Sequence, residues 1–216
     1  MKKSITITAM LFLLTGMLYA QKTSIGFHAG STFSNQIWKY ENESLTLDHI
    51  FGFQAGIVAD LPLGNHISIQ PGLNFLQKGA NLKEEQSGIT YEQIIRSSNI
   101  EIPLNFLYNT RGKSGNFFVG VGPAVSFALG GKFKEKVTNE EDFEEDISFG
   151  NDEQEDDLRG LDFGINALVG YQFKPGFFIS ANYNLGLRNL TPGGNADDGT
   201  MKSRYFGIRI GYMLNR

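Results

Sequence analysis

The sequence predicts an all-β protein, an eight-stranded antiparallel up-and-down transmembrane β-barrel with short periplasmic turns and long extracellular loops. Three observations predict this fold: apolar residues alternate with glycine and polar residues, the alternation recurs in eight segments, and the connections between them are alternately short and long. Strict alternation indicates strands with two different faces. A barrel with an apolar face toward lipid and a small, polar inner face has this pattern.

Residues 1–20 have the features of a cleaved secretory signal peptide. Lys2 and Lys3 form a basic start, a mainly apolar stretch follows, and Ala20 ends it with a small residue. A retained helical anchor is the alternative. Removal of the leader leaves residues 21–216 as one outer-membrane β-barrel domain, in which no segment approaches the roughly 18 continuous apolar residues of a transmembrane helix.

Most of the expected strands have enough residues for a tilted strand to cross the hydrocarbon layer. In the first strand, Ile25 and Phe27 alternate with Gly26 and His28, and the glycines of the other expected strands also fall on the polar side of the alternation. The expected strands cover residues 23–34, 50–61, 67–76, 99–108, 117–129, 161–173, 177–188 and 204–214.

The connections between these strands indicate which end of the barrel is which. Three of them are short, at residues 62–65, 109–116 and 174–176. The others are longer, at residues 35–49, 77–98, 130–160 and 189–203. Outer-membrane barrels have short periplasmic turns and long external loops, so both ends of the domain are expected on the periplasmic side.

Alternation alone does not decide between a membrane barrel and a soluble barrel of the lipocalin type, which buries its apolar face. Two features favour the membrane. The polar face lacks the Lys, Glu and Thr that usually cover a wet sheet, and the apolar rows are unbroken, as from Ile100 to Tyr108 and from Phe206 to Leu214. Because no water in the bilayer can satisfy a free strand edge, such a sheet has to close.

The longest loop, residues 130–160, is strongly acidic. It holds twelve acidic and four basic residues. Such a run repels itself, so we expect it to stay solvated and mobile outside the membrane. Clustered carboxylates also suggest Ca²⁺, but the spacing of a Ca²⁺-binding loop is missing, and weak attraction of divalent ions is the simpler expectation.

A few charged residues fall on the inward side of the strands. Buried charges are tolerated only when they are paired and hydrogen-bonded. We therefore expect Glu101 and Asp162 to pair with Arg188 and Arg209 in a network that fills the lumen. A gated polar path is the alternative. The predicted lumen charge network consists of Glu101, Asp162, Arg188, Arg209, Asp60 and His28.

Aromatic residues are expected at the two membrane surfaces, where outer-membrane barrels carry aromatic girdles. Trp38 has a second interpretation, as a loop residue that contacts a partner. The predicted interface aromatics are Trp38, Tyr108, Tyr171, Phe173 and Tyr212.

Composition and motifs argue against several other functions. The net charge of −4 argues against nucleic acid as a partner, and the absence of Cys excludes disulfides and thiolate sites. The three His have no metal-ligand spacing and no phosphate-binding loop occurs, so no metal or cofactor is expected. An enzyme is a further alternative, with Asp48 and His49 beside Ser31 or Ser98, but nothing in the sequence fixes their geometry.

Several strand segments, taken together, resemble a known family. They are residues 67–73 with 77–79, 100–104, 118–123, 162–164 and 183–187. In this order they resemble the PorT-like, porin-family group of small outer-membrane β-barrel proteins. The resemblance implies export through the periplasm and a place in the bacterial outer membrane, and it implies no catalytic residue.

The expected function is therefore a non-enzymatic structural or interaction role in the outer membrane, with a lumen filled by side chains. The alternatives are a narrow porin for small solutes and a soluble ligand-binding barrel. The expected partners are outer-membrane lipid and lipopolysaccharide, the periplasmic chaperones and barrel-assembly machinery during biogenesis, and secretion or surface partners whose identity the sequence does not give.

Overall fold

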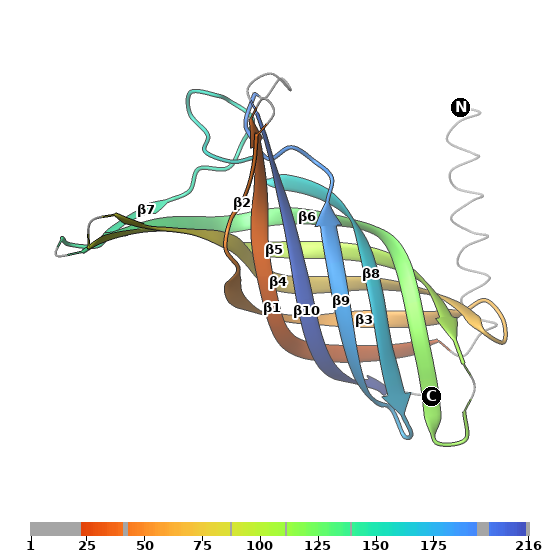
Figure 1. The fold of residues 1–216 in the computed structure, drawn as a ribbon. Coiled ribbons are helices and arrows are strands. Elements are labelled where there is room, and N and C mark those ends of the chain that lie inside the picture. Colours follow the sequence, from red (N-terminus) through yellow and green to blue (C-terminus); the bar gives the residue numbers. More distant parts are fainter. Residues whose placement is uncertain are drawn as a thin grey trace, which may run out of the picture.

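The computed structural model shows a closed, tilted barrel with strands that extend well beyond it at one end (Figure 1). It describes residues 23–40, 43–86, 88–110, 112–138, 140–193 and 199–214. The predicted signal peptide lies outside the described residues. Within them, no helix is long and apolar enough to cross a membrane.

Eight long antiparallel strands form the barrel, which confirms the predicted fold class. Two short strands, β2 (Glu43–Thr46) and β7 (Phe143–Asp146), pair with β1 and β6 outside the ring. The barrel strands are β1 (Ser24–Tyr40), β3 (Ile50–Pro62), β4 (Ile67–Gln86), β5 (Ile89–Asn109), β6 (Gly115–Val137), β8 (Leu161–Phe173), β9 (Phe177–Gly186) and β10 (Thr200–Leu214).

The first and last strands close the ring. β1 pairs with β10 over their whole length, from Ile25 opposite Leu214 to Lys39 opposite Thr200. Closure satisfies backbone N–H and C=O groups that would otherwise face hydrocarbon, where each unpaired group costs several kcal/mol.

The two faces of the barrel have the orientation that the sequence predicts. Ile102 and Ile208 on the outer rows are 47% and 43% exposed, whereas Glu101 and Arg209 on the neighbouring inner rows are 1% and 4% exposed. A continuous apolar outer surface is stable in lipid rather than in water. The apolar rows therefore form the lipid-facing surface.

Two arms project past the barrel at the long-loop end, and both consist largely of residues that were expected in loops. Residues 77–98 were expected as a loop, but most of them continue β4 and β5 in register as far as Gln86 opposite Ile89. The prediction failed because this hairpin is half-polar on both faces and lies outside lipid, so the apolar alternation stops while the hydrogen-bonded ladder continues.

We name the two projections by their strands. The β1–β10 arm consists of residues 35–40, β2 and residues 200–203, and the β4–β6 arm consists of residues 79–86, 89–96 and 132–137 with β7. A tilted strand needs only about 9–11 residues to cross the membrane. The 23 residues of β6 therefore reach well into the external solvent.

One additional residue in β6 changes which side chains face inward. The pairing of β5 with β6 shifts between Ser98 and Asn99, and Leu129 is the extra residue of this β-bulge. Before the bulge, even-numbered residues such as Ser126 face the lumen. After it, the odd-numbered Phe133 packs against the inner apolar cluster of the arms.

The acidic segment, residues 140–160, packs against the arms at a few positions, while most of its charged side chains are exposed to solvent, as expected. β7 pairs with β6, and Ile147 donates a backbone hydrogen bond to Gly131 (3.0 Å). The expectation weighed the charges and overlooked the apolar residues among them. These join residues of both arms in an apolar group, here called the cap cluster: Ile147, Leu158 and Leu190, with Ile95, Phe133, Phe149 and Met201 packed against them.

The orientation of the outer rows can be tested with one charge. We expect Ile102→Arg to lower the free energy of unfolding by about 2–4 kcal/mol, because the guanidinium would lie among lipid chains. The measurement is a denaturant titration of the protein folded in lipid vesicles. The matched control is Ile89→Arg, at the tip of the β4–β6 arm, where Ile89 is 41% exposed. Equal losses for both variants would contradict the orientation.

Candidate functional site

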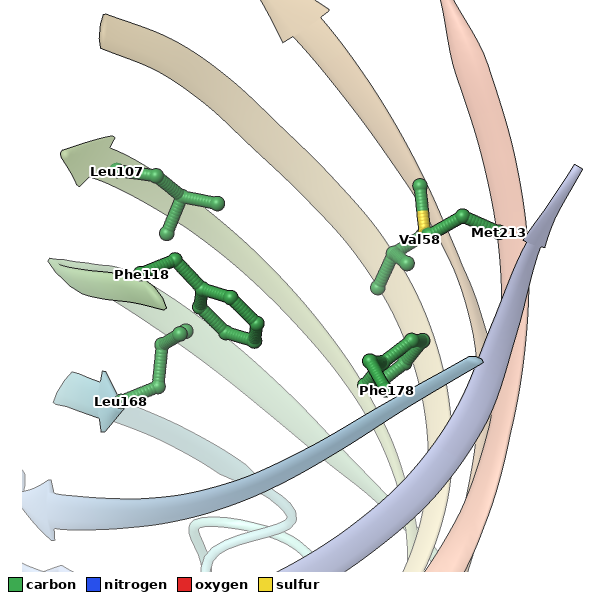
Figure 2. Packing of buried hydrophobic residues seen from close by; sticks show 6 residues of the cluster. All are labelled: Val58, Leu107, Phe118, Leu168, Phe178 and Met213. Carbon is green, nitrogen blue, oxygen red and sulfur yellow. The ribbon is translucent and has the colours of Figure 1, made fainter. Parts of the chain in front are cut away.

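The lumen at the short-turn end is filled by an apolar plug (Figure 2). The rings of Phe118 and Phe178 meet edge to face, with centroids 6.5 Å apart. Next to the plug lies a cavity of about 20 Å³, which is enough for about one water molecule. The plug consists of Val58, Leu107, Phe118, Leu168, Phe178 and Met213.

Inward glycines make room for the plug. A Cβ atom on Gly170 would lie 2.4 Å from the ring of Phe118, and one on Gly211 would lie 2.5 Å from the ring of Phe178. The glycines on the polar side of the alternation thus allow large apolar side chains inside a narrow ring. Sequence reasoning recognised the glycines but missed the plug, because its residues come singly from different strands.

A chain of buried amides crosses the middle of the lumen. Asn166 donates to Asn105 (2.8 Å), Asn182 donates to Asn166 (3.4 Å), and Gln54 donates to Asn182 (3.5 Å). The four side chains are at most 3% exposed. Paired amides are stable in such a site, whereas unpaired ones are costly.

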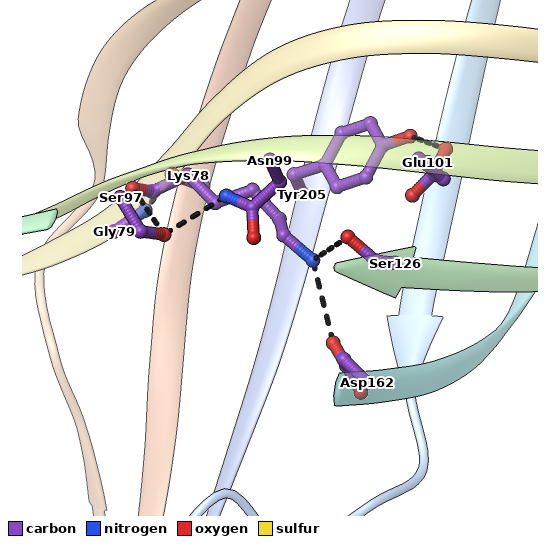
Figure 3. A network of polar contacts seen from close by, with 9 residues as sticks. Lys78, Gly79, Ser97, Asn99, Glu101, Ser126, Asp162 and Tyr205 are labelled. Carbon is purple, nitrogen blue, oxygen red and sulfur yellow. Dashed lines mark hydrogen bonds and ion pairs between the residues drawn. The ribbon is translucent and has the colours of Figure 1, made fainter. Parts of the chain in front are cut away.

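Above the amides, toward the long-loop end, lies a buried ionic group (Figure 3). The Lys78 ammonium lies 3.3 Å from Asp162 Oδ2 and donates to Ser126 Oγ at 3.1 Å. The Tyr205 hydroxyl donates to Glu101 Oε1 at 2.6 Å. Both side chains of the ion pair are less than 10% exposed, so their attraction is screened little by solvent.

The structure corrects the predicted pairing of these charges. Asp162 pairs with Lys78 and not with an arginine. Arg209 is buried, but its guanidinium donates to Ser180 Oγ (3.2 Å). Arg188 is outside the lumen network altogether. β9 ends at Gly186, so the alternation does not reach Arg188, and its guanidinium lies 5.8 Å from the centre of the outward-facing Phe163 ring.

Lys78 is a charged lumen residue that sequence reasoning missed. The expected third strand ended at residue 76, one inward position short of it. Continuing the even-numbered row of β4 from Asn74 through Leu76 leads to Lys78, which is 5% exposed. The alternation therefore places residue 78 on the inward side, but the expected strand ended before it.

The two remaining predicted lumen residues, His28 and Asp60, line the small cavity beside the plug. Each is 4% exposed. The His28 Nε2 atom is 3.1 Å from Asn74 Oδ1. Arg209 also borders this cavity, so the lower lumen brings three of the six predicted residues together around one small space.

Four of the five predicted interface aromatics lie on the outer surface at the short-turn end. Tyr108 is 53% exposed and stacks on His66, with centroids 5.8 Å apart. Tyr171 and Phe173 meet edge to face at 4.8 Å, and Tyr212 lies 6.4 Å from the Phe27 ring.

Trp38 occupies a different place. It lies on the inward side of β1, in the β1–β10 arm, and its indole N–H donates to Gln36 Oε1 (3.4 Å). This placement corrects its prediction as a lipid-interface residue. The strand continues past the membrane before it reaches Trp38, so the ring lies beside the external pockets of the arms.

The residues weighed for catalysis are not assembled. Ser31 lies opposite Ile208 and Phe53, on the outer rows of the barrel. His49 is exposed before β3, and Asp48 exchanges backbone hydrogen bonds with Asn81. In the part of the chain that the structure describes, no hydrogen bond joins His49 to Ser31 or Ser98. The same residues contain no group of three or more His, Asp or Glu that could hold a metal ion.

Ion pairs on the β4–β6 arm attach β7 to β6. Lys134 lies 2.9 Å from Asp142, and Lys132 pairs with Glu144. Hydrogen bonding to Asp142 raises the pKa of Lys134, and the same contact lowers the pKa of Asp142. These groups are exposed to solvent, where such pairs contribute little to stability.

A closed ring of eight strands, apolar outside and polar inside, defines a small outer-membrane β-barrel protein of bacteria. The model of the family described as "outer membrane protein beta-barrel domain" matches residues 19–191. The chain belongs to this family and resides in the outer membrane.

Solved structures of small outer-membrane proteins match most of this chain. Ail, the attachment invasion locus protein of Yersinia pestis, is 15% identical, with a TM-score of 0.43, and the match covers 90% of this chain and 100% of that one. OprG from Pseudomonas aeruginosa is 11% identical, with a TM-score of 0.44, and the match covers 90% of this chain and 97% of that one. A search of curated proteins found no match.

The buried ion pair can be tested by removing its cation. We expect Lys78→Met to lower the free energy of unfolding by about 3–5 kcal/mol, because it leaves Asp162 as an uncompensated buried charge. Denaturant titration and heat-modifiable gel mobility measure the loss. The double variant Lys78→Met/Asp162→Leu is the control, and we expect it to recover at least half of that stability. Wild-type stability of the single variant would contradict the pairing.

Proposed function

We propose that this protein is a non-enzymatic surface receptor that binds a partner protein through its two external arms, while its lumen stays closed. The observation that carries the proposal is the exposure of large apolar side chains on the arms, outside the membrane. Tyr40 and Leu45 on the β1–β10 arm are 62% and 50% exposed, and Tyr91 and Phe143 on the β4–β6 arm are 42% and 55% exposed. Exposed apolar groups that face water rather than lipid mark interaction surfaces.

The shape of the arms supports the same proposal. The arm strands β1, β4, β5, β6 and β10 continue from the barrel (Figure 1), and β2 and β7 pair with β1 and β6, so the ring fixes where the exposed side chains lie. A surface held in this way loses little conformational entropy on binding.

A finer part of the proposal concerns the family group and the general partners. The strand segments quoted above favour the PorT-like group, whose members include components linked to secretion. Lipid and lipopolysaccharide would contact the outer rows, and periplasmic chaperones and the barrel-assembly machinery would act during biogenesis.

Crosslinking in intact cells tests the arm surface. We expect a photo-reactive amino acid at Tyr91 or Phe143 to give discrete protein adducts, because these side chains point into the external solvent. The same group at Ile179, which is 45% exposed on the lipid-facing rows, is the matched control and should give lipid adducts only. Identical adduct patterns at arm and control positions would refute the proposal.

A narrow porin is the second candidate, and the buried polar middle of the lumen favours it. The plug and the single-water cavity argue for a closed state instead. We expect no steady conductance from the unaltered protein in planar lipid bilayers, and measurable openings from Phe118→Ala/Phe178→Ala, which removes the two rings that meet in the lumen. A steady open pore in the unaltered protein would support the porin and contradict the closed lumen.

A further inference from the structure

A pocket opens on the external side between the two arms, away from the lumen and from the membrane. Its volume is about 360 Å³, within the range of about 300–1,000 Å³ typical of small-molecule sites. Its walls come from three parts of the chain: the β1–β10 arm, the β4–β6 arm and the acidic segment. Its lining residues are Trp38, Ile95, Phe133, Glu145, Asp146, Ile147, Asp157, Leu158 and Met201.

The floor of this pocket is apolar, and its side chains pack against the other residues of the cap cluster. Ile147 and Leu158 are 9% and 7% exposed, and both belong to the cap cluster. The indole of Trp38 is 37% exposed, so its ring remains accessible from the pocket. A floor of this kind favours an apolar or aromatic body over a bare inorganic ion.

The rim of the pocket carries charge of one sign. Glu145, Asp146 and Asp157 line it, and no Lys or Arg is among its lining residues. The nearby lysines of β6, Lys132 and Lys134, are engaged with Glu144 and Asp142. An anion would therefore be repelled, whereas a cation would be attracted to the carboxylates and to the face of the tryptophan ring.

We propose that this pocket binds a small organic cation with an apolar body, such as an arylalkylammonium compound. The apolar part lies on the floor formed by Ile147, Leu158 and Met201, and the ammonium group lies between Trp38 and the acidic rim. The site goes beyond the receptor function proposed above, because it needs neither a protein partner nor an open lumen.

Trp38 allows direct observation of the site, because it is the only tryptophan in the chain. The experiment titrates 3-phenylpropylammonium into the protein in zwitterionic lipid nanodiscs and follows the NMR signal of the Trp38 indole N–H. A saturable shift is expected, with the neutral 3-phenylpropanol binding about tenfold or more weakly because it lacks the charge. Equal affinity for the two compounds, or no saturable shift, would overturn the proposal.

Charge-matched variants distinguish binding at the acidic rim of the pocket from nonspecific attraction to the acidic segment. Glu145→Gln/Asp146→Asn should weaken binding of the ammonium compound about tenfold or more, since both residues line the pocket and Glu145 lies on the same face of the sheet as Phe133. Glu140→Gln/Glu141→Gln removes the same charge from the same segment outside the pocket, and it should leave the affinity nearly unchanged. Equal weakening by both pairs would show nonspecific attraction and refute the site.

Trp38 also borders a second external pocket, so one further control is needed. That pocket is lined by Glu43, Leu45 and Thr191 among others. Glu43→Gln should not change the affinity, and a loss confined to this variant would assign the signal to the second pocket and contradict the proposal. Binding of a lysine-rich peptide without binding of the small ammonium compound would likewise contradict it in favour of a protein ligand.

Discussion

Closure of the backbone hydrogen-bond ladder is the constraint on which the rest of this structure depends. Lipid offers no partner to an unpaired N–H or C=O group, so β1 has to meet β10. A ring of only eight strands has a narrow interior. Every inward side chain is therefore buried, and each polar one needs a partner inside the ring. The amide chain and the Lys78–Asp162 pair supply such partners.

Much of the barrel could be predicted from the sequence because lipid imposes a single rule on each strand. Residues such as Ile102 and Ile208 have to be apolar where they meet hydrocarbon, while the opposite rows are free to hold Gly, Asn and Gln. The positions of Glu101, Asp162 and Arg209 on the inner face followed from the same rule. This rule predicts the face on which a residue lies, but it does not predict which inward side chains contact one another.

The remainder could not be predicted for the same physical reason. Lys78 lies two residues past the expected end of the third strand, and Arg188 lies two residues past the actual end of β9, so in each case an error of two residues decides whether a side chain is assigned to the lumen. Pairing across a barrel depends on register and tilt, which the sequence of one strand does not contain. Beyond the membrane the alternation is lost, so the arms and the cap cluster left only a weak pattern of scattered apolar residues such as Ile147 and Leu158.

The bulge at Leu129 separates the barrel from the arm that grows out of it. Because side chains alternate along a strand, insertion or deletion of one residue between Leu129 and Phe133 would exchange the two faces of β6 in the arm, turning Lys132 and Lys134 toward the cap cluster. An insertion or deletion of two residues would leave each side chain on its present face and only shift it along the strand. Length variation in this part of related chains should therefore occur in even steps, with odd steps tolerated only where a second bulge restores the phase.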